Sequence, residues 1–295
     1  MNIQNWIKEN TSSLVGKTVA ITGSTGGLGV ETCFHLASLG ANFIFINRNL
    51  PKSNNLKHQL EEIYPNIKID IVSADLSNFK SVKQAVEILK QKQIDYLILN
   101  AGVYAIPQQK TDIGYNNIFT TNFVSHYYMV KELLPILRNT KGKVVCVGSI
   151  AHNYSKLDIN DIDYSTRKKH SKVYGNSKRF LMFSLMELFK NETAVAISIV
   201  HPGVTLTNIT NHYPKLVYAL IKWPMKILFP SPKKASLHIV CGLFNSTIQN
   251  YWIGPKTFSV WGKPKINKLK SCKENESKKI FEIAENIYKK LKNSG

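Results

Sequence analysis

The stretch TVAITGSTGGLG, residues 18–29, decides the fold of this 295-residue chain. Its first five residues are apolar or β-branched, as in a buried strand, and four glycines follow within the next seven positions. A helical pattern covers residues 30–39. A strand, a glycine-rich turn and a helix in this order bring free backbone N–H groups and a helix N-terminus to one point, which favours a bound pyrophosphate. The stretch therefore predicts a dinucleotide-binding turn.

Short apolar runs recur along the chain and alternate with helical patterns. We expect strands at 18–22, 42–46, 67–72, 96–99, 144–147, 194–200 and 258–260, and helices at 30–39, 56–63, 81–90, 119–137 and 274–291. This alternation predicts the α/β class: a single Rossmann-type domain over residues 1–295, with a doubly wound parallel sheet flanked by helices. Two parts stand outside the alternation, namely a helical insert at about 204–231 that we expect to cover the substrate, and a basic tail at about 263–295 with an appended C-terminal helix.

The composition excludes several classes of protein. Hydrophobic residues make up 43% of the chain, so disorder throughout is excluded. The four cysteines lie far apart without disulfide or metal-ligand spacing, so we expect a reducing, cytoplasmic location and no metal site. The formal net charge is +20, which we attribute mainly to lysines scattered over solvated faces. Because no nucleic-acid-binding module is recognisable, nucleic acid is not an expected partner.

The sequence contains no segment expected to cross a membrane. Residues 1–10 lack the apolar core of a signal peptide, and no run reaches the roughly 18 apolar residues of a spanning helix. The apolar run at 216–229 is interrupted by Lys222, Pro224 and Lys226. This insert is interpreted first as a substrate lid, while weak peripheral membrane contact stays open. The tail from Lys263 carries ten lysines and four glutamates and could also touch a phosphate-rich surface.

The residues that follow the other strands bear on the choice of cofactor. The second strand ends in Asn47-Arg48-Asn49, with no acidic residue to hold a ribose 2′-hydroxyl. Arg48 can hold a 2′-phosphate by two hydrogen bonds, so NADP(H) is the preferred cofactor and NAD(H) remains possible. Asp75 could meet the adenine, or it could be the N-cap of the next helix. The turn Asn100-Ala101-Gly102 is small enough for a cofactor to pass.

Four polar residues supply the chemistry of carbonyl reduction. Tyr174 and Lys178 are four apart and share one helix face, where the tyrosine can give a proton to a forming alkoxide. A lysine cation at about 4 Å is worth roughly 4 kcal/mol at an effective dielectric near 20, on the order of three pKa units, so we expect a lowered pKa for Tyr174. Ser149 can polarise the substrate carbonyl, and Asn122 could anchor a water in a proton relay.

Together these motifs resemble the short-chain dehydrogenase/reductase family. The resemblance rests on Thr22-Gly23-xxx-Gly27-x-Gly29, Asp75, Asn100-Ala101-Gly102, Asn122, Ser149, Tyr174-xxx-Lys178 and His201-Pro202-Gly203-Val204-xx-Thr207, in family order. Gly16-Lys17, Asn47-Arg48-Asn49 and the residues around Tyr174 are most similar to its retinol dehydrogenase-like and WW-domain oxidoreductase-like branch. Gly148 departs from the pattern, since a serine is common there.

The resemblance implies an oxidoreductase and assigns roles. Asn122, Ser149, Tyr174 and Lys178 would form a catalytic tetrad. The residues expected to bind the cofactor are Gly23, Ser24, Thr25, Gly27, Leu28, Gly29, Arg48, Asp75, Leu76, Asn100, Ala101, Gly102, Tyr174, Lys178, Pro202, Gly203, Val204 and Thr207. The family often forms dimers through two long helices, here 119–137 and 177–189, although the tail helix could cover that surface and leave a monomer.

The residues expected around the substrate are mostly apolar or aromatic. They are Val103, Tyr104, Ile106, His152, Tyr154, Leu206, Ile209, Tyr213, Leu216, Tyr218, Trp223 and Phe229. Such a lining suits an apolar ketone, aldehyde or alcohol. The alternative function is a catalytically weak NAD(P)-binding sensor or scaffold of the same fold. His152 and His201 have no partners at metal-ligand spacing, so we interpret them as structural or pocket-lining residues.

Overall fold

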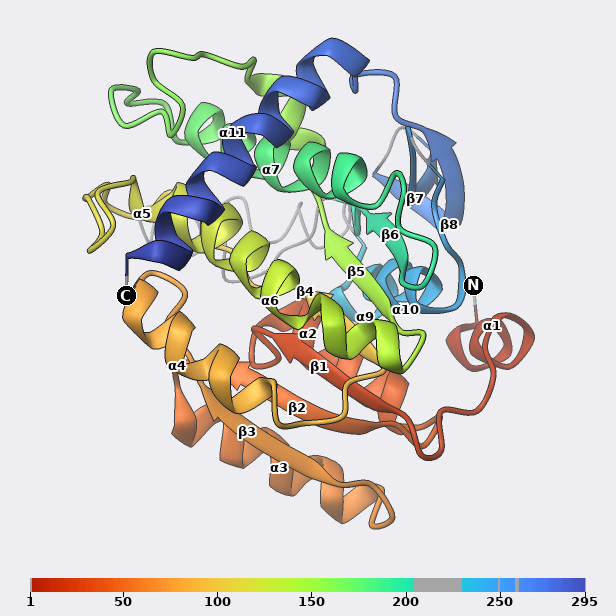
Figure 1. Cartoon of the computed structure of the whole chain (residues 1–295). Helices are drawn as coiled ribbons and strands as arrows, with labels where there is room; N and C mark the ends of the chain where they lie inside the picture. Colours follow the sequence, from red (N-terminus) through yellow and green to blue (C-terminus); the bar gives the residue numbers. More distant parts are fainter. Residues whose placement is uncertain (1, 204–229, 249, 258–259, 295) are drawn as a thin grey trace, which may run out of the picture.

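The computed structural model describes residues 2–203, 230–248, 250–257 and 260–294, and these form layers around one eight-stranded sheet (Figure 1). The strands lie in the order β3-β2-β1-β4-β5-β6-β7-β8. They are β1 (Thr18–Thr22), β2 (Asn42–Asn47), β3 (Ile69–Ser73), β4 (Tyr96–Leu99), β5 (Lys143–Val147), β6 (Ala196–Val200), β7 (Tyr251–Thr257) and β8 (Trp261–Lys268). The pairs from β3 to β7 are parallel, and only β8 is antiparallel to its neighbour. The chain reverses direction across the sheet between β1 and β4, which is where doubly wound folds bind ligands.

Helices cover both faces of the sheet because successive strand side chains point in opposite directions. Val144 and Cys146 of β5 belong to a core with α4, α6, α7 and α11, whereas Val145 and Val147 belong to a core with α1, α2, α3 and α10. The helices are α1 (Ile3–Asn10), α2 (Gly27–Ala37), α3 (Leu50–Ile63), α4 (Phe79–Leu89), α5 (Asn117–Phe119), α6 (Ser125–Asn139), α7 (His170–Leu188), α9 (Pro232–Ala235), α10 (Leu237–Phe244) and α11 (Glu274–Asn293). The predicted doubly wound architecture is confirmed.

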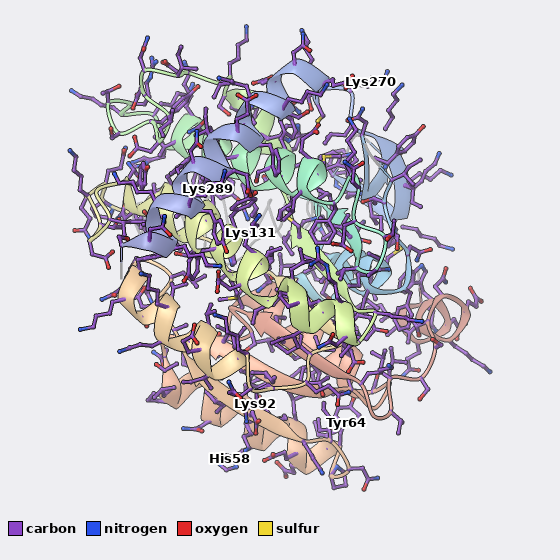
Figure 2. The ribbon with its side chains drawn as sticks, in the orientation of Figure 1. His58, Tyr64, Lys92, Lys131, Lys270 and Lys289 are labelled. Atoms are coloured by element: carbon purple, nitrogen blue, oxygen red, sulfur yellow. The ribbon has the colours of Figure 1, made fainter. Side chains whose placement is uncertain are left out.

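The appended C-terminal helix is also confirmed, and it lies across α7 and α6 (Figure 1). Its apolar face is buried at Ile280, Ala284, Ile287 and Leu291. Glu285 of α11 accepts hydrogen bonds from the Tyr127 hydroxyl at 2.5 Å and from Lys131 Nζ at 3.0 Å. Figure 2 labels Lys131 on α6, below this crossing. The helix therefore covers part of the surface through which the family resemblance implies dimerisation, as the alternative expectation of a covering tail helix had it.

Some expected boundaries were wrong. Residues 258–259 of the expected last strand at 258–260 lie outside the described part, and Val260 lies in the turn between β7 and β8. The basic run that forms β8 was missed because its lysines hide any alternation of apolar residues. Helix α1 was missed as well; its polar surface leaves only Trp6 buried, against the second core.

The insert expected at 204–231, with Val204 and Thr207, lies outside the described residues except for positions 230 and 231. Within residues 2–203 and the described segments after 229, no helix combines the length and the apolar character that crossing a membrane requires.

Candidate active site

A cavity of about 440 Å³ opens beyond the carboxyl ends of β1 to β4. Eleven of the residues expected to bind the cofactor line it. They are Gly23, Thr25, Gly27, Leu28, Gly29, Arg48, Asp75, Leu76, Asn100, Ala101 and Gly102. The cavity therefore coincides with the switch point of the sheet.

The glycine-rich turn places the N-terminus of α2 at this cavity. Gly26 is the N-cap of α2, and Gly26 and Gly27 both line the cavity. A Cβ on Gly29 would lie 2.3 Å from the carbonyl oxygen of Gly23, so no larger residue fits where the helix passes the turn. The free N–H groups of the first turn and the helix dipole favour an anion there. The turn is thus shaped for a phosphate-bearing cofactor.

Ser24 supports the turn from behind, since its side chain is fully buried. Asn47, the last residue of β2, accepts a hydrogen bond from Ser24 N at 3.1 Å and donates to Ser24 Oγ at 2.7 Å and to Ser53 Oγ at 2.9 Å. The sequence reasoning did not assign Asn47 to the site. Its signal was an amide ending an otherwise apolar, buried strand, because a buried polar group needs partners.

Basic and acidic side chains meet at the adenine end expected for the cofactor. Arg48 is largely exposed, and its Nη1 lies 4.0 Å from Asp75 Oδ2. Lys52 lines the same end of the cavity. Asp75 Oδ1 accepts hydrogen bonds from the backbone N–H of Ser77 at 2.9 Å and from its hydroxyl at 2.7 Å. The N-cap of α4 is Asn78, so the alternative role of Asp75 as that N-cap is wrong.

A buried histidine joins the glycine-rich turn to the expected tetrad. Thr22 Oγ1 accepts the N–H groups of Asn100 and Ala101, each at 3.0 Å, and its own proton can go to Ile98 O at 3.4 Å or to His126 Nε2, the nearer acceptor, at 3.0 Å. His126 Nδ1 then carries the proton and donates to the carbonyl oxygen of Asn122 at 3.1 Å. Burial lowers the pKa of His126 to about 3, which keeps the ring neutral. The sequence reasoning missed His126, whose only signal was its place four residues after Asn122.

Asn122 lies in a five-residue π-helical turn, Thr120–Val124, before α6. Its Oδ1 accepts the N–H of Val103 at 2.8 Å, and its Nδ2 donates to Val103 O and to Ser177 Oγ, each at 3.0 Å. Single π turns inside helices often mark functional sites. The side chain therefore holds the end of β4 against α7, and any water anchor would have to use its backbone carbonyl.

Lys178 of α7 is buried beside Asn122. Its Nζ donates to the carbonyl oxygen of Val147 at 2.8 Å, and burial lowers its pKa to about 8. A Cβ on Gly102 would lie 3.4 Å from Asn122 Oδ1 and 3.5 Å from Lys178 Nζ. Because Gly102 also lines the cavity, Asn122 and Lys178 of the tetrad stand directly beside that cavity.

Tyr174 and Ser149 complete the group. A side-chain hydrogen bond joins them, and the ring of Tyr104 packs edge-on against Tyr174 with centroids 5.2 Å apart. Burial raises the pKa of Tyr174 to about 12, although the bond to Ser149 opposes the rise. The expected lowering by Lys178 is wrong for this structure, because the Nζ lies 5.9 Å from the centre of the tyrosine ring and bonds to a carbonyl. The structure thus brings together the four residues expected to form the tetrad.

The remaining expected residues lie nearby. Pro202 is buried. Gly203 has a φ of +84°, and a Cβ added to it would lie only 2.9 Å from Val260 O. Neither residue lines the cavity. A Cβ on Gly148 would lie 2.7 Å from Met182 Sδ, so any larger residue at this position would require the methionine side chain to shift.

His152 and His201 both pack against other side chains of the protein, in keeping with a structural role. His152 is buried between the carbonyl oxygen of Ser149, 2.6 Å from its Nδ1, and Ser271 Oγ, 2.5 Å from its Nε2. His201 stacks on Trp252 with ring centres 5.1 Å apart. Among the described residues, no three His, Cys, Asp or Glu side chains are grouped to hold a metal ion.

The geometry defines a dinucleotide-binding α/β protein, and comparisons with known proteins give its family. The family model "short chain dehydrogenase" matches residues 17–215. Short-chain dehydrogenase TIC 32 A, chloroplastic, of Brassica napus is 33% identical over 213 residues, which is 66% of this chain and 66% of that protein, just under two thirds of each. Human retinol dehydrogenase 12 is 29% identical over 262 residues, 82% of this chain and 81% of that protein. A crystal structure of an uncharacterised protein from Mycobacterium paratuberculosis has a TM-score of 0.75 at 22% identity and covers 95% of this chain and 96% of its own, which shows the fold.

The chain therefore belongs to the short-chain dehydrogenase family, a family of oxidoreductases, and has retinol dehydrogenase-like relatives.

Proposed function

We propose that this protein is an NADP(H)-dependent oxidoreductase that interconverts an apolar ketone or aldehyde and its alcohol. The observation that carries the proposal is the position of Gly102. This residue lines the nucleotide cavity and also borders Asn122 Oδ1 and Lys178 Nζ. A nicotinamide that extends from the cavity past Gly102 would arrive beside the tetrad. Cofactor binding and proton transfer would then share one location.

The protein's own residues can handle the proton and the substrate oxygen. When bound, NADPH would supply the hydride. Ser149 would donate a hydrogen bond to the carbonyl oxygen, where negative charge develops as the carbon is reduced. Tyr174 would give its hydroxyl proton to that oxygen, which it can do throughout the neutral range because burial holds its pKa at about 12. Lys178, whose Nζ lies beside Gly102 at the edge of the cavity, would hold the ribose of the cofactor while it is charged.

The proposed preference for NADP(H) rests on Arg48 and Lys52, since both line the end of the cavity where a 2′-phosphate would lie. The partner carboxylate of Arg48 is 4.0 Å away, so the guanidinium is free to turn towards a phosphate. Fluorescence titration with NADPH and NADH on wild type and Arg48→Ala tests this. We expect the variant to lose affinity for NADPH only. Lys8→Ala removes an exposed charge elsewhere and is the control. Equal binding of both cofactors by wild type would refute the preference.

The apolar character of the substrate is proposed from fewer residues. Val103 and Ile106 line the cavity, and Tyr104 packs on Tyr174. His152 is buried against Ser271, and Tyr154 is mostly exposed, so neither supports the proposal. The other expected residues, 206 to 229, are outside the described part. A panel of aliphatic and aromatic carbonyls beside sugar carbonyls tests the class, and faster turnover of sugars would contradict it.

The alternative is a sensor or scaffold that binds the cofactor without turnover. The tetrad geometry argues against it, because a sensor has no need of a buried lysine and a tyrosine paired with serine. Tight NADPH binding without oxidation on the whole carbonyl panel would favour this alternative, whereas any turnover lost in Tyr174→Phe would exclude it.

Partners and location are proposed as follows. Because α11 covers part of the α6–α7 face, we expect any homodimer to use another surface, which size-exclusion chromatography with light scattering can test. Weak peripheral membrane contact by the insert at 204–231 and a cytoplasmic location remain proposals from the sequence. Fractionation of cells that express the full chain tests both, and recovery only in an integral-membrane fraction would refute them.

A further inference from the structure

One surface of the molecule holds lysines that no acidic residue balances. From residue 193 to residue 273 the chain contains eleven lysines and no aspartate or glutamate. Five of these lysines are exposed on and just after the hairpin of β7 and β8: Lys256, Lys263, Lys265, Lys268 and Lys270. None of the five forms an ion pair within the described structure. The residues outside the described part carry no acidic side chain, so they cannot supply a carboxylate partner from a side chain either.

Three of these lysines surround a hollow beside the catalytic loop. Lys256, Lys268 and Lys270 line a space of about 530 Å³ together with Asn153, Asn267 and Ser271. Figure 2 labels Lys270 at the edge of the molecule, between β8 and the start of α11. Ile150 and Asn153, which also line it, belong to the 3₁₀ helix that follows Ser149. Three lysine side chains and two asparagine side chains thus line one concave space.

Hydrogen bonds also connect the hollow to Ser149 of the active site. Ser271 Oγ lies 2.5 Å from His152 Nε2, and His152 Nδ1 lies 2.6 Å from the carbonyl oxygen of Ser149. A carbonyl can only accept, so Nδ1 carries the proton and Nε2 accepts from Ser271. A ligand held in the hollow would therefore lie two hydrogen bonds away from Ser149.

We propose that this hollow binds a phosphate group, with Lys256, Lys268 and Lys270 as its cationic ligands and the side-chain amide of Asn267 as a hydrogen-bond donor. The alternative role of such lysines is to keep an edge strand from pairing with other chains. That role explains lysines along β8, but it does not require Lys256 on β7 and Lys270 after β8 to face the same hollow. The phosphate could belong to a soluble ligand or to the headgroup of an anionic lipid, and the two sources separate experimentally.

The test compares wild type with Lys256→Gln/Lys268→Gln/Lys270→Gln. The control is Lys8→Gln/Lys80→Gln/Lys289→Gln, which removes the same charge from exposed positions elsewhere. Calorimetric titration with inorganic phosphate measures the soluble source. Co-sedimentation with vesicles of phosphatidylcholine, with and without phosphatidylserine, measures the lipid source. Since the nucleotide cavity is the same in all three proteins, phosphate bound there does not differ between them.

We expect the hollow variant to lose binding to one of the two probes by about a hundredfold, from roughly 1 kcal/mol for each lysine, and the control to bind like wild type. Loss for inorganic phosphate identifies a soluble ligand, and loss for phosphatidylserine vesicles alone identifies a lipid headgroup. Equal weakening of both variants would overturn the proposal, because net charge would then explain it. Absence of wild-type binding to either probe would overturn it as well. Thermal unfolding of each variant shows that it is folded.

Discussion

The ion pair between Arg179 and Glu276 should hold the catalytic helix to the C-terminal helix. Arg179 directly follows Lys178 in α7, and its Nε donates to Glu276 Oε1 at 2.7 Å, with a second bond from Nη2 to Oε2. The arginine side chain is only 6% exposed and the glutamate side chain 20%. Arg179 Nη1 also donates to the carbonyl oxygen of His152 at 3.2 Å. One side chain therefore links α7, α11 and the loop after Ser149.

Removing one partner should be costly, because it leaves the other charge buried without compensation. Breaking such a pair typically costs about 3–5 kcal/mol of folding stability. We therefore expect Glu276→Gln and Arg179→Met each to lower the free energy of unfolding by about 3 kcal/mol. The double variant Arg179→Met/Glu276→Gln should lose clearly less stability than the sum of the two single losses, because neither charge remains. Urea unfolding monitored by circular dichroism measures these differences, provided that the urea dependence of the free energy is unchanged.

Glu274→Gln is the control, since Glu274 forms only exposed ion pairs with Lys190 and Lys278 and should change stability little. Burial alone would raise the pKa of Glu276, but the hydrogen bonds and charge of Arg179 outweigh it and leave that pKa below the ordinary value. The stabilisation is therefore present above the unfolded carboxyl pKa and is lost as the pH falls through the folded one. The reasoning is refuted if Glu276→Gln unfolds at the same urea concentration as Glu274→Gln at neutral pH.

Three further predictions concern the active site. Tyr174→Phe should bind NADPH like wild type but lower turnover at least about a hundredfold, because the proton donor is removed; weaker binding with normal turnover would contradict this. Carbonyl reduction should fall above pH 8, since the pKa of Lys178 is about 8 and its charge is lost there, and a flat pH–rate profile to pH 10 would contradict it. His126→Phe should weaken NADPH binding and turnover together, because it removes the hydrogen bonds that join Thr22 to Asn122. His126→Asn should retain more turnover, because its amide can still bond to the Asn122 carbonyl. Equal effects of the two variants would count against this role of His126.

Much of the site was predictable because each part is local in the sequence. The glycine-rich turn needs only a strand, four glycines and a helix within twenty residues, and the spacing of Tyr174 and Lys178 follows from one helical turn. The predicted strands 18–22 and 96–99 match β1 and β4 as found, because strands buried on both faces are nearly continuous in apolar character. Edge strand β8 escaped prediction because it is exposed and basic.

The pKa of Tyr174 shows where local reasoning stops. A lysine one helical turn away suggested a lowered value, yet burial of the hydroxyl raises it to about 12. Desolvation depends on every atom packed around the group, including the Tyr104 ring, and no spacing along the chain reports that.

The sequence by itself determined the class of fold, the phosphate turn and the residue types of the tetrad, because these depend on short-range periodicity and on chemistry that few side chains can perform. Only the tertiary structure decided that α11 covers α6 and α7, that His126 joins Thr22 to Asn122, and that Lys256, Lys268 and Lys270 share one hollow. In each of these cases, segments that lie apart along the chain contact one another or line the same cavity. Such contacts are fixed by the packing of the whole sheet and its helices, and not by any local pattern.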